Sequence, residues 1–126
     1  MYLRYKAYRQ NREKLTSMAY MCLTVLEGRA AWRDKATGKK REKAAKQYCI
    51  DIKVLDTLGK LCTAKGDATE ARKYPENGAF TPLNPKEKEW IVSVIKILIS
   101  RVGEYGYAHS TGAKLKQITM GDFPKI

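Results

Sequence analysis

The sequence predicts an all-α protein, an antiparallel bundle of three long helices plus one short helix, with an extended C-terminal tail. Apolar residues recur at helical spacings along three segments, Gly and Pro residues separate these segments, and the C-terminal stretch alternates too poorly for a strand. The chain has 126 residues, of which 44% are hydrophobic, so it is long enough to bury one core without disulfides or metals. We therefore expect a single domain spanning residues 1–126.

The first long helix is expected between Tyr5 and Glu27, with Gly28 as a reasonable terminator. Apolar residues recur along it every three, four or seven positions, which indicates one face turned toward a core. These residues are Tyr8, Leu15, Met18, Cys22 and Val25. Basic residues surround the first turns on nearly every side, so we expect that end of the helix to face solvent.

The second long helix is expected to begin near residues 37–39 and to end at about Lys65, before Gly66. Gly59 lies within its apolar pattern, where a glycine costs up to ~1 kcal/mol relative to alanine. Two explanations stay open, a close contact with another helix or an early end of this one. The apolar seam consists of Ala45, Tyr48, Ile52, Leu55, Leu58 and Cys62.

A short helix is predicted over residues 68–74, because Asp67 and Glu70 stand in a capping-box pattern. The linker that follows is rich in proline and long enough to cross the bundle. We expect Phe80 and Leu83 to anchor this linker in the core.

The third long helix, residues 84–107, has the best-defined start. Asn84 suits the N-cap, Pro85 fits the first helical position, and Glu87 completes a capping box. The β-branched run at residues 91–100 also fits a buried strand, but its length and its polar spacing favour a helix. The polar residues Ser93, Lys96, Ser100 and Glu104 form one narrow stripe, opposite the broad apolar face of Ile91, Val94, Ile95, Leu98, Val102 and Tyr105.

The tail, residues 108–126, is expected to be extended and packed on the bundle. Pro124 argues against a late helix. The apolar side chains of Leu115, Ile118, Met120 and Phe123 are expected to lie along a groove of the same bundle, and a groove of a neighbouring chain is the alternative. Trp90, in the third helix, is expected to be buried.

The net charge of +12 is concentrated in the N-terminal half. Residues 1–50 contain 13 basic and 4 acidic residues, whereas residues 51–126 contain 12 and 9. A basic cluster of this kind indicates a polyanionic partner, most often nucleic acid. The alternative is a solvated, highly charged surface without a partner.

Candidate nucleic-acid contacts lie in the first turns of the first helix and along the second helix. Lysines on one side of the second helix form a rail whose spacing resembles that of successive phosphates. Against this, acidic residues four positions away can pair with two of them, Glu42 with Lys46 and Asp56 with Lys60. Nearby tyrosines can stack on bases, although packing is their more frequent role. The predicted contact residues are Arg4, Arg9, Arg12, Lys39, Lys40, Arg41, Lys43, Lys46 and Lys53.

No motif of a known catalytic or metal site is present, so no catalytic residue, metal ligand or cofactor is predicted. The three cysteines lack C-x-x-C spacing and are interpreted as buried thiols in a reducing, cytoplasmic compartment. No apolar run is long enough to span a bilayer, and the N-terminus is too polar for a secretory signal. We therefore expect no membrane partner.

His109 is the sole imidazole, and it follows Arg101 after seven intervening residues. HEPN ribonucleases are small helical bundles that carry an Arg and a His at a shorter spacing, so no resemblance is claimed. The first hypothesis is a non-catalytic accessory subunit that binds RNA or DNA through phosphate contacts. The alternative is a helical protein-interaction or homo-oligomeric assembly module, and a small HEPN-like ribonuclease ranks third.

Overall fold

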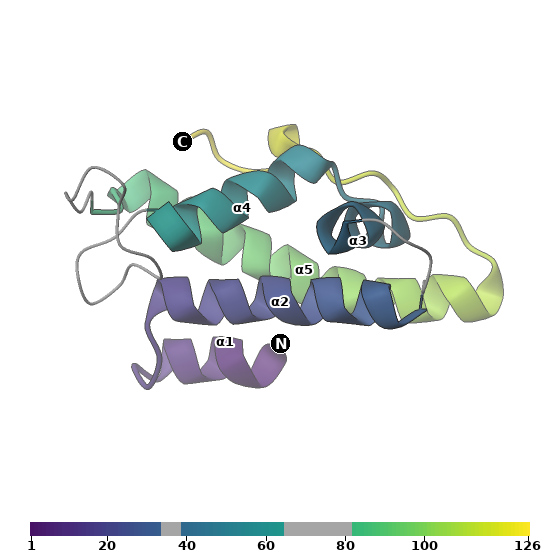
Figure 1. Cartoon of the computed structure of the whole chain (residues 1–126), viewed down its shortest axis with the longest axis horizontal. Coiled ribbons are helices and arrows are strands. Elements are labelled where there is room, and N and C mark those ends of the chain that lie inside the picture. Colours follow the sequence, from purple (N-terminus) through teal and green to yellow (C-terminus); the bar gives the residue numbers. More distant parts are fainter. Residues whose placement is uncertain (34–38, 65–81) are drawn as a thin grey trace.

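The computed structural model describes residues 1–33, 39–64 and 82–126, in which most residues are helical and no strand is present (Figure 1). The all-α class is therefore confirmed. The helices are α1 (Tyr2–Arg9), α2 (Leu15–Arg33), α3 (Lys40–Tyr48), α4 (Ile52–Ala64), α5 (Pro85–Thr111) and the short 3-10 helix η1 (Met120–Asp122). None of these helices is long and apolar enough to cross a membrane.

The expected first long helix is two helices, because the chain turns back between α1 and α2. Asn11 adopts a left-handed conformation with φ of 58°, which asparagine tolerates better than most residues. The amides of Asn11 and Arg12 close the end of α1 by donating to the carbonyls of Tyr8 and Ala7. Tyr8 before the turn and Leu15 after it both pack against the core, so the apolar spacing continues across a break in the helix.

The expected second long helix is also two helices, α3 and α4. Cys49 ends α3 in the left-handed region, with φ of 56° and ψ of 53°. Here the backbone bonds to the tail instead of continuing the helix. Ile118 donates to the Cys49 carbonyl at 2.9 Å, Asp51 donates to the Ile118 carbonyl at 2.8 Å, and Ile50 and Ile118 form an isolated parallel bridge.

Helix α5 starts as the sequence predicts. The Asn84 side chain accepts from the Glu87 amide at 2.8 Å, and the Glu87 carboxylate accepts from the Asn84 amide at 3.0 Å. This reciprocal pair satisfies two backbone donors at the helix start. The helix continues past the predicted end at Tyr107 to Thr111, and Gly112 ends it with φ of 75°.

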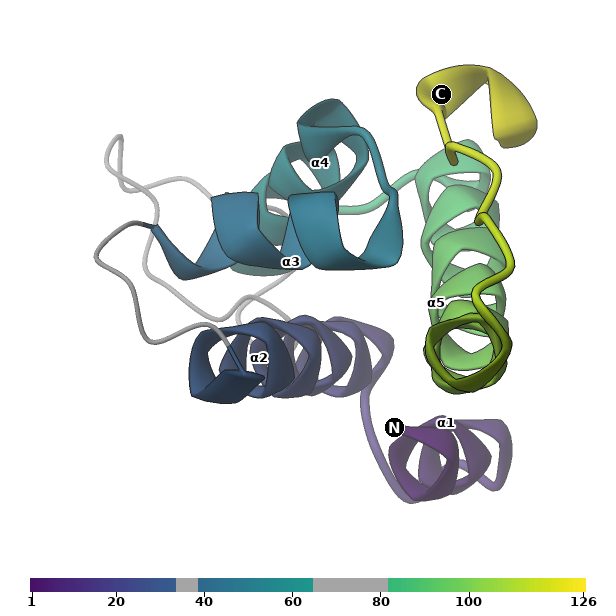
Figure 2. The same cartoon turned by 90° about the vertical axis from the view of Figure 1, so that its right-hand side faces the viewer.

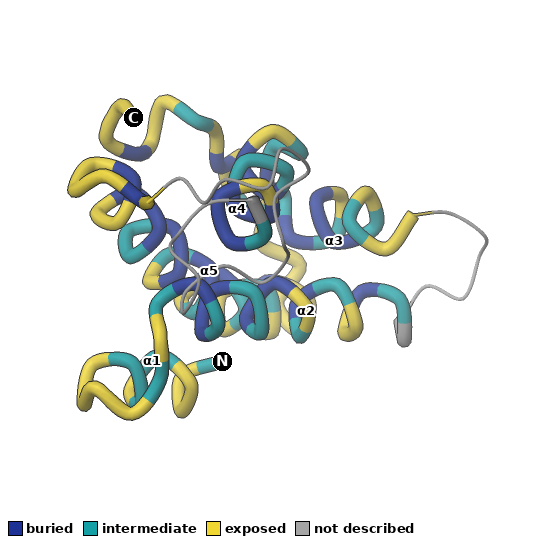
Figure 3. The backbone as a smooth tube through the Cα atoms, turned by 60° about the vertical axis from the view of Figure 1, so that its left-hand side comes forward, coloured by how far each residue is buried: buried dark blue, intermediate teal, exposed yellow. Residues whose placement is uncertain are grey.

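The core lies where α2, α3, α4 and α5 meet, and Figure 3 shows the buried stretches of these helices facing one another. Trp90 and Leu83 are buried as predicted. The arrangement is not the expected bundle of three long helices, because α3 and α4 are short and run in different directions above α2 (Figures 1 and 2).

After Gly112 the tail is extended except at η1, and it packs on the bundle; residues 108–111, expected to belong to the tail, are the last residues of α5. Ile118 and Phe123 are buried, and the Phe123 ring meets Trp90 edge-on with centroids 5.9 Å apart. The tail stays beside α5 because Trp90 and Arg101 of that helix hold it at two separate points. Helix η1 was not predicted. The short helix predicted at residues 68–74, the end of the second helix at Lys65 and the anchor Phe80 lie outside the described residues.

Candidate nucleic-acid interface

The predicted basic residues lie in two separate groups. Arg4 and Arg9 belong to α1, which packs on one side of α2, whereas Lys40, Lys43 and Lys46 belong to α3 on the opposite side (Figures 1 and 2). The two groups therefore do not share one face.

The lysine rail predicted along one helix is broken at Cys49. Lys39 precedes α3, and Lys43 and Lys46 belong to α3, whereas Lys53 belongs to α4, which runs in another direction (Figure 2). Lys39, Lys40, Lys46 and Lys53 are exposed, and Lys43 is half-buried.

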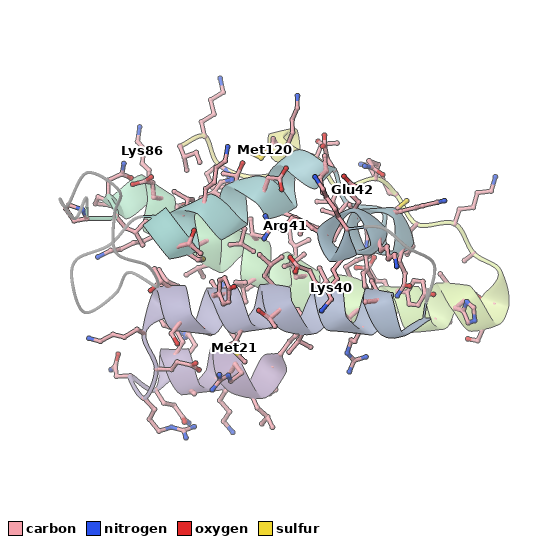
Figure 4. The ribbon with its side chains drawn as sticks, in the orientation of Figure 1. Met21, Lys40, Arg41, Glu42, Lys86 and Met120 are labelled. Atoms are coloured by element: carbon pink, nitrogen blue, oxygen red, sulfur yellow. The ribbon has the colours of Figure 1, made fainter. Side chains whose placement is uncertain are left out.

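Arg41 is part of the fold and not of the predicted rail. Its guanidinium donates to Glu27 of α2 at 2.9 Å and to Asp56 of α4 at 3.2 Å, where the three helices meet (Figure 4). Asp56, expected from the sequence to pair with Lys60, pairs with Arg41 in the structure. Burial lowers the pKa of Arg41, but the hydrogen bonds and charges of both carboxylates outweigh it and raise the pKa above its ordinary value.

Gly59 makes room for this arginine. A Cβ atom at Gly59 would lie 3.0 Å from both terminal nitrogens of the Arg41 guanidinium. Of the two explanations for a glycine in this helix, the structure shows a close contact, made by a side chain of α3. The helix itself continues to Ala64.

A cleft of about 370 Å³ beside Arg41 is lined by Lys39 and Lys40, but also by Glu27, Glu42 and Asp56. Three carboxylates among three cations leave little net attraction for an anion. The basic residues at the start of α3 are therefore a weaker phosphate site than their number suggests.

A second cleft, which we name the turn cleft, lies between the α1–α2 turn and α5, and has a volume of about 360 Å³. Lys88 reaches it from the first turns of α5, although 73 residues separate Lys88 from Lys14 in the sequence. The lining residues are Tyr8, Asn11, Arg12, Glu13, Lys14, Leu15 and Lys88.

The turn cleft has an excess of positive charge. Arg12 donates through Nε and Nη2 to the Gln10 side chain at 3.0 and 2.6 Å, which orients its guanidinium. Glu13 is the one carboxylate among the described residues that line the cleft, and Arg4 lies 3.3 Å from it. The other Glu13 oxygen is buried and has no hydrogen-bond partner among the residues described. Lys14 and Lys88 are exposed, and within the described ranges neither forms an ion pair.

Sequence reasoning found Arg12 but missed Lys88 and the cleft itself. The periodicity of a continuous helix concealed the turn at residues 10–14. Nothing in the sequence places the start of α5 beside that turn.

Arg101 is buried inside the structure, with 5% of its surface exposed. Its guanidinium donates to the carbonyls of Tyr48 at 2.7 Å, Cys49 at 3.2 Å and Lys116 at 2.9 Å, and it lies 3.4 Å from Glu104. It thereby binds the end of α3 to the tail. A signal for this role is present in the sequence, since Arg101 lies seven positions after Val94, on the apolar side of the helix.

His109 is exposed near the end of α5, where its ring stacks on Tyr105 with centroids 5.7 Å apart. Nη1 and Nη2 of Arg101 donate to backbone carbonyls of the fold. The geometry therefore lends no support to a catalytic pair of Arg101 and His109.

The part of the chain that the structure describes contains no cluster of three or more histidine, cysteine or acidic residues able to hold a metal ion. The three cysteines all lie within the described residues and form no disulfide. Cys22 and Cys62 are buried, as expected, whereas Cys49 is only half-buried. Burial raises the pKa of the Cys22 thiol to about 11, so it is protonated at neutral pH.

Comparison of the chain with protein-family models, with curated protein sequences and with solved structures finds no match. Indications of function therefore come from the surface of the molecule alone.

Proposed function

We propose that this protein is a non-catalytic, basic helical protein that binds nucleic acid, RNA or DNA, largely through phosphate contacts, as an accessory subunit. The observation that carries the proposal is the turn cleft, where Arg12, Lys14 and Lys88 come from two distant segments to line one concave surface. Like charges repel one another, so an arrangement of this kind is stabilised when an anion binds between them.

The overall charge supports the same partner. A net charge of +12 on 126 residues attracts a polyanion over distances of about a Debye length, roughly 8 Å at physiological salt. The exposed lysines near α3, Lys39, Lys40 and Lys46, then add contacts on the other side of α2. A ligand that reaches both groups has to pass around α2.

Salt dependence tests the proposal. Binding of a short RNA and of a short DNA duplex is measured between low and physiological salt, because phosphate contacts release counterions and their affinity falls as salt rises. Replacing Arg12, Lys14 and Lys88 with glutamine removes the charge of the turn cleft. The salt slope is expected to flatten by roughly 0.7 to 0.9 for every phosphate contact that the substitutions remove.

Two further variants make this experiment specific. Glutamine at Lys39, Lys40 and Lys46 tests the α3 group; Arg41 is left intact because it bridges Glu27 and Asp56. Glutamine at the exposed tail residues Lys114, Lys116 and Lys125 removes the same charge elsewhere. Equal losses of affinity from all three variants would indicate non-specific attraction to a basic protein. No binding near physiological salt would refute the proposal.

One observation favours the alternative of a helical assembly module. Helix α1 has no buried residue, and its Tyr2 and Leu3 are 60% and 76% exposed. Two neighbouring large apolar side chains that are both exposed offer a surface on which a second protein can pack. Sedimentation of the wild-type chain and of Leu3→Ser tests this alternative, which predicts a concentration-dependent oligomer that the substitution dissociates.

A further inference from the structure

The turn cleft combines its three cations with an aromatic ring. Tyr8 lines the cleft, is half-buried, and has Tyr5 beside it with ring centroids 6.3 Å apart. Packing against the core and against Tyr5 limits the positions that the Tyr8 ring can adopt. Proteins that bind single strands combine cationic side chains with aromatic rings on which unpaired bases stack.

The cleft also has a suitable size. Its volume of about 360 Å³ is within the range of small-molecule sites, about 300–1,000 Å³, and suits one nucleotide. A base inside a duplex is stacked between its neighbours, so its face is not available to a protein ring. A single strand presents both a phosphate and a free base face.

We propose that the turn cleft binds one nucleotide of a single-stranded nucleic acid, with the phosphate among Arg12, Lys14 and Lys88 and the base against Tyr8. This inference rests on the proposed function and adds the form of the nucleic acid. Arg12 is suited to the phosphate because Gln10 occupies two of its five N–H donors and holds the side chain in place. The charge of Glu13 is offset by Arg4.

The first experiment compares a labelled single strand with the duplex of the same sequence, using the full chain and fluorescence anisotropy. The single strand is expected to bind at least about fivefold more tightly. Lys88→Gln should weaken single-strand binding. It should also reduce the factor by which affinity falls between 50 and 200 mM salt by about 2.6-fold, because one phosphate contact contributes a slope of about 0.7 and the salt concentration rises fourfold. Lys114→Gln, an exposed lysine of the tail, is the matched control.

The second experiment tests the ring. Tyr8→Leu should weaken single-strand binding at least about fivefold and leave duplex binding unchanged, because stacking is lost and the cations remain. Tyr8→Phe keeps the ring and should bind as the wild type does. In case Tyr8→Leu does not fold, adenosine monophosphate and inorganic phosphate are compared as competitors of the wild-type complex, and the nucleotide should compete at a lower concentration.

The outcomes separate this inference from the proposed function. If neither single strand nor duplex binds, both fail. If nucleic acid binds but the duplex binds as tightly as the single strand, or Lys88→Gln matches Lys114→Gln, the function stands and the turn cleft is not the nucleotide site. If inorganic phosphate competes as effectively as the nucleotide, the base does not contribute to binding. Tyr8 then has no role, and the inference is overturned.

Discussion

Replacing Arg101 with methionine should destabilise the protein by about 2 to 4 kcal/mol. The guanidinium donates three hydrogen bonds, to Tyr48, Cys49 and Lys116, and a hydrogen bond to a charged group contributes roughly 1.5 to 3 kcal/mol. The sum is an upper bound, since two of the three bonds are only partly buried and those carbonyls regain water in the variant. Methionine keeps most of the apolar stem, so the loss reports mainly on the guanidinium.

The assay is urea unfolding followed by helical circular dichroism. A loss of this size is a large part of the about 5 to 15 kcal/mol that stabilises a typical domain. Lys96→Met, on the exposed side of the same helix, is the control and should change stability by about 0.5 kcal/mol or less. Arg101→Lys keeps the charge but lacks the fork that reaches several carbonyls, so it should recover less than half of the loss.

A second measurement follows the tail. Without its donor from Arg101, the carbonyl of Lys116 no longer holds the tail to α5, so trypsin should cleave after Lys114 and Lys116 faster than in the wild type. A stability loss equal to that of Lys96→Met, with unchanged cleavage, would refute the role assigned to Arg101.

Three further predictions follow from the packing and burial of named side chains. Gly59→Ala should be nearly neutral in the wild type, because the gain of up to ~1 kcal/mol in helix propensity is offset by displacement of Arg41. In an Arg41→Gln background the same change should stabilise the protein. Urea unfolding of the wild type, both single variants and the double variant checks this. Phe123→Ala should cost about 2 to 4 kcal/mol by the same measurement, since only 7% of this residue is exposed; a stable variant would show that the tail is not structural. Cys49, which is half-buried, should react with a thiol reagent at pH 8 well before the buried Cys22, whose pKa is about 11. Because the Cys22 pKa is raised from the ordinary value of 9.0, this thiol favours the folded state fully below pH 9, and that contribution to the free energy of unfolding declines as pH rises toward 11.

The sequence was sufficient for features that depend on local chemistry. The start of α5 follows from Asn84 and Glu87, which close the capping box within one turn, and from Pro85 at the first helical position. The apolar faces of the helices and the burial of Trp90 follow from helical spacing, because the hydrophobic effect favours burial of an apolar face in any fold. The all-α class and the packed tail rest on the same reasoning.

Only the tertiary structure decided where the helices break and which charges meet. The end of α3 at Cys49 depends on hydrogen bonds to Ile118, nearly seventy residues away, and a periodic sequence carries no trace of a distant partner. Arg41 is spaced like a surface residue, yet it lies between two carboxylates because α2 and α4 come together at its side chain. Lys88 likewise joins the turn cleft through the packing of α5 near α1. Helical spacing depends on neighbours within one turn, whereas a charged site depends on where separate helices are brought together by the core.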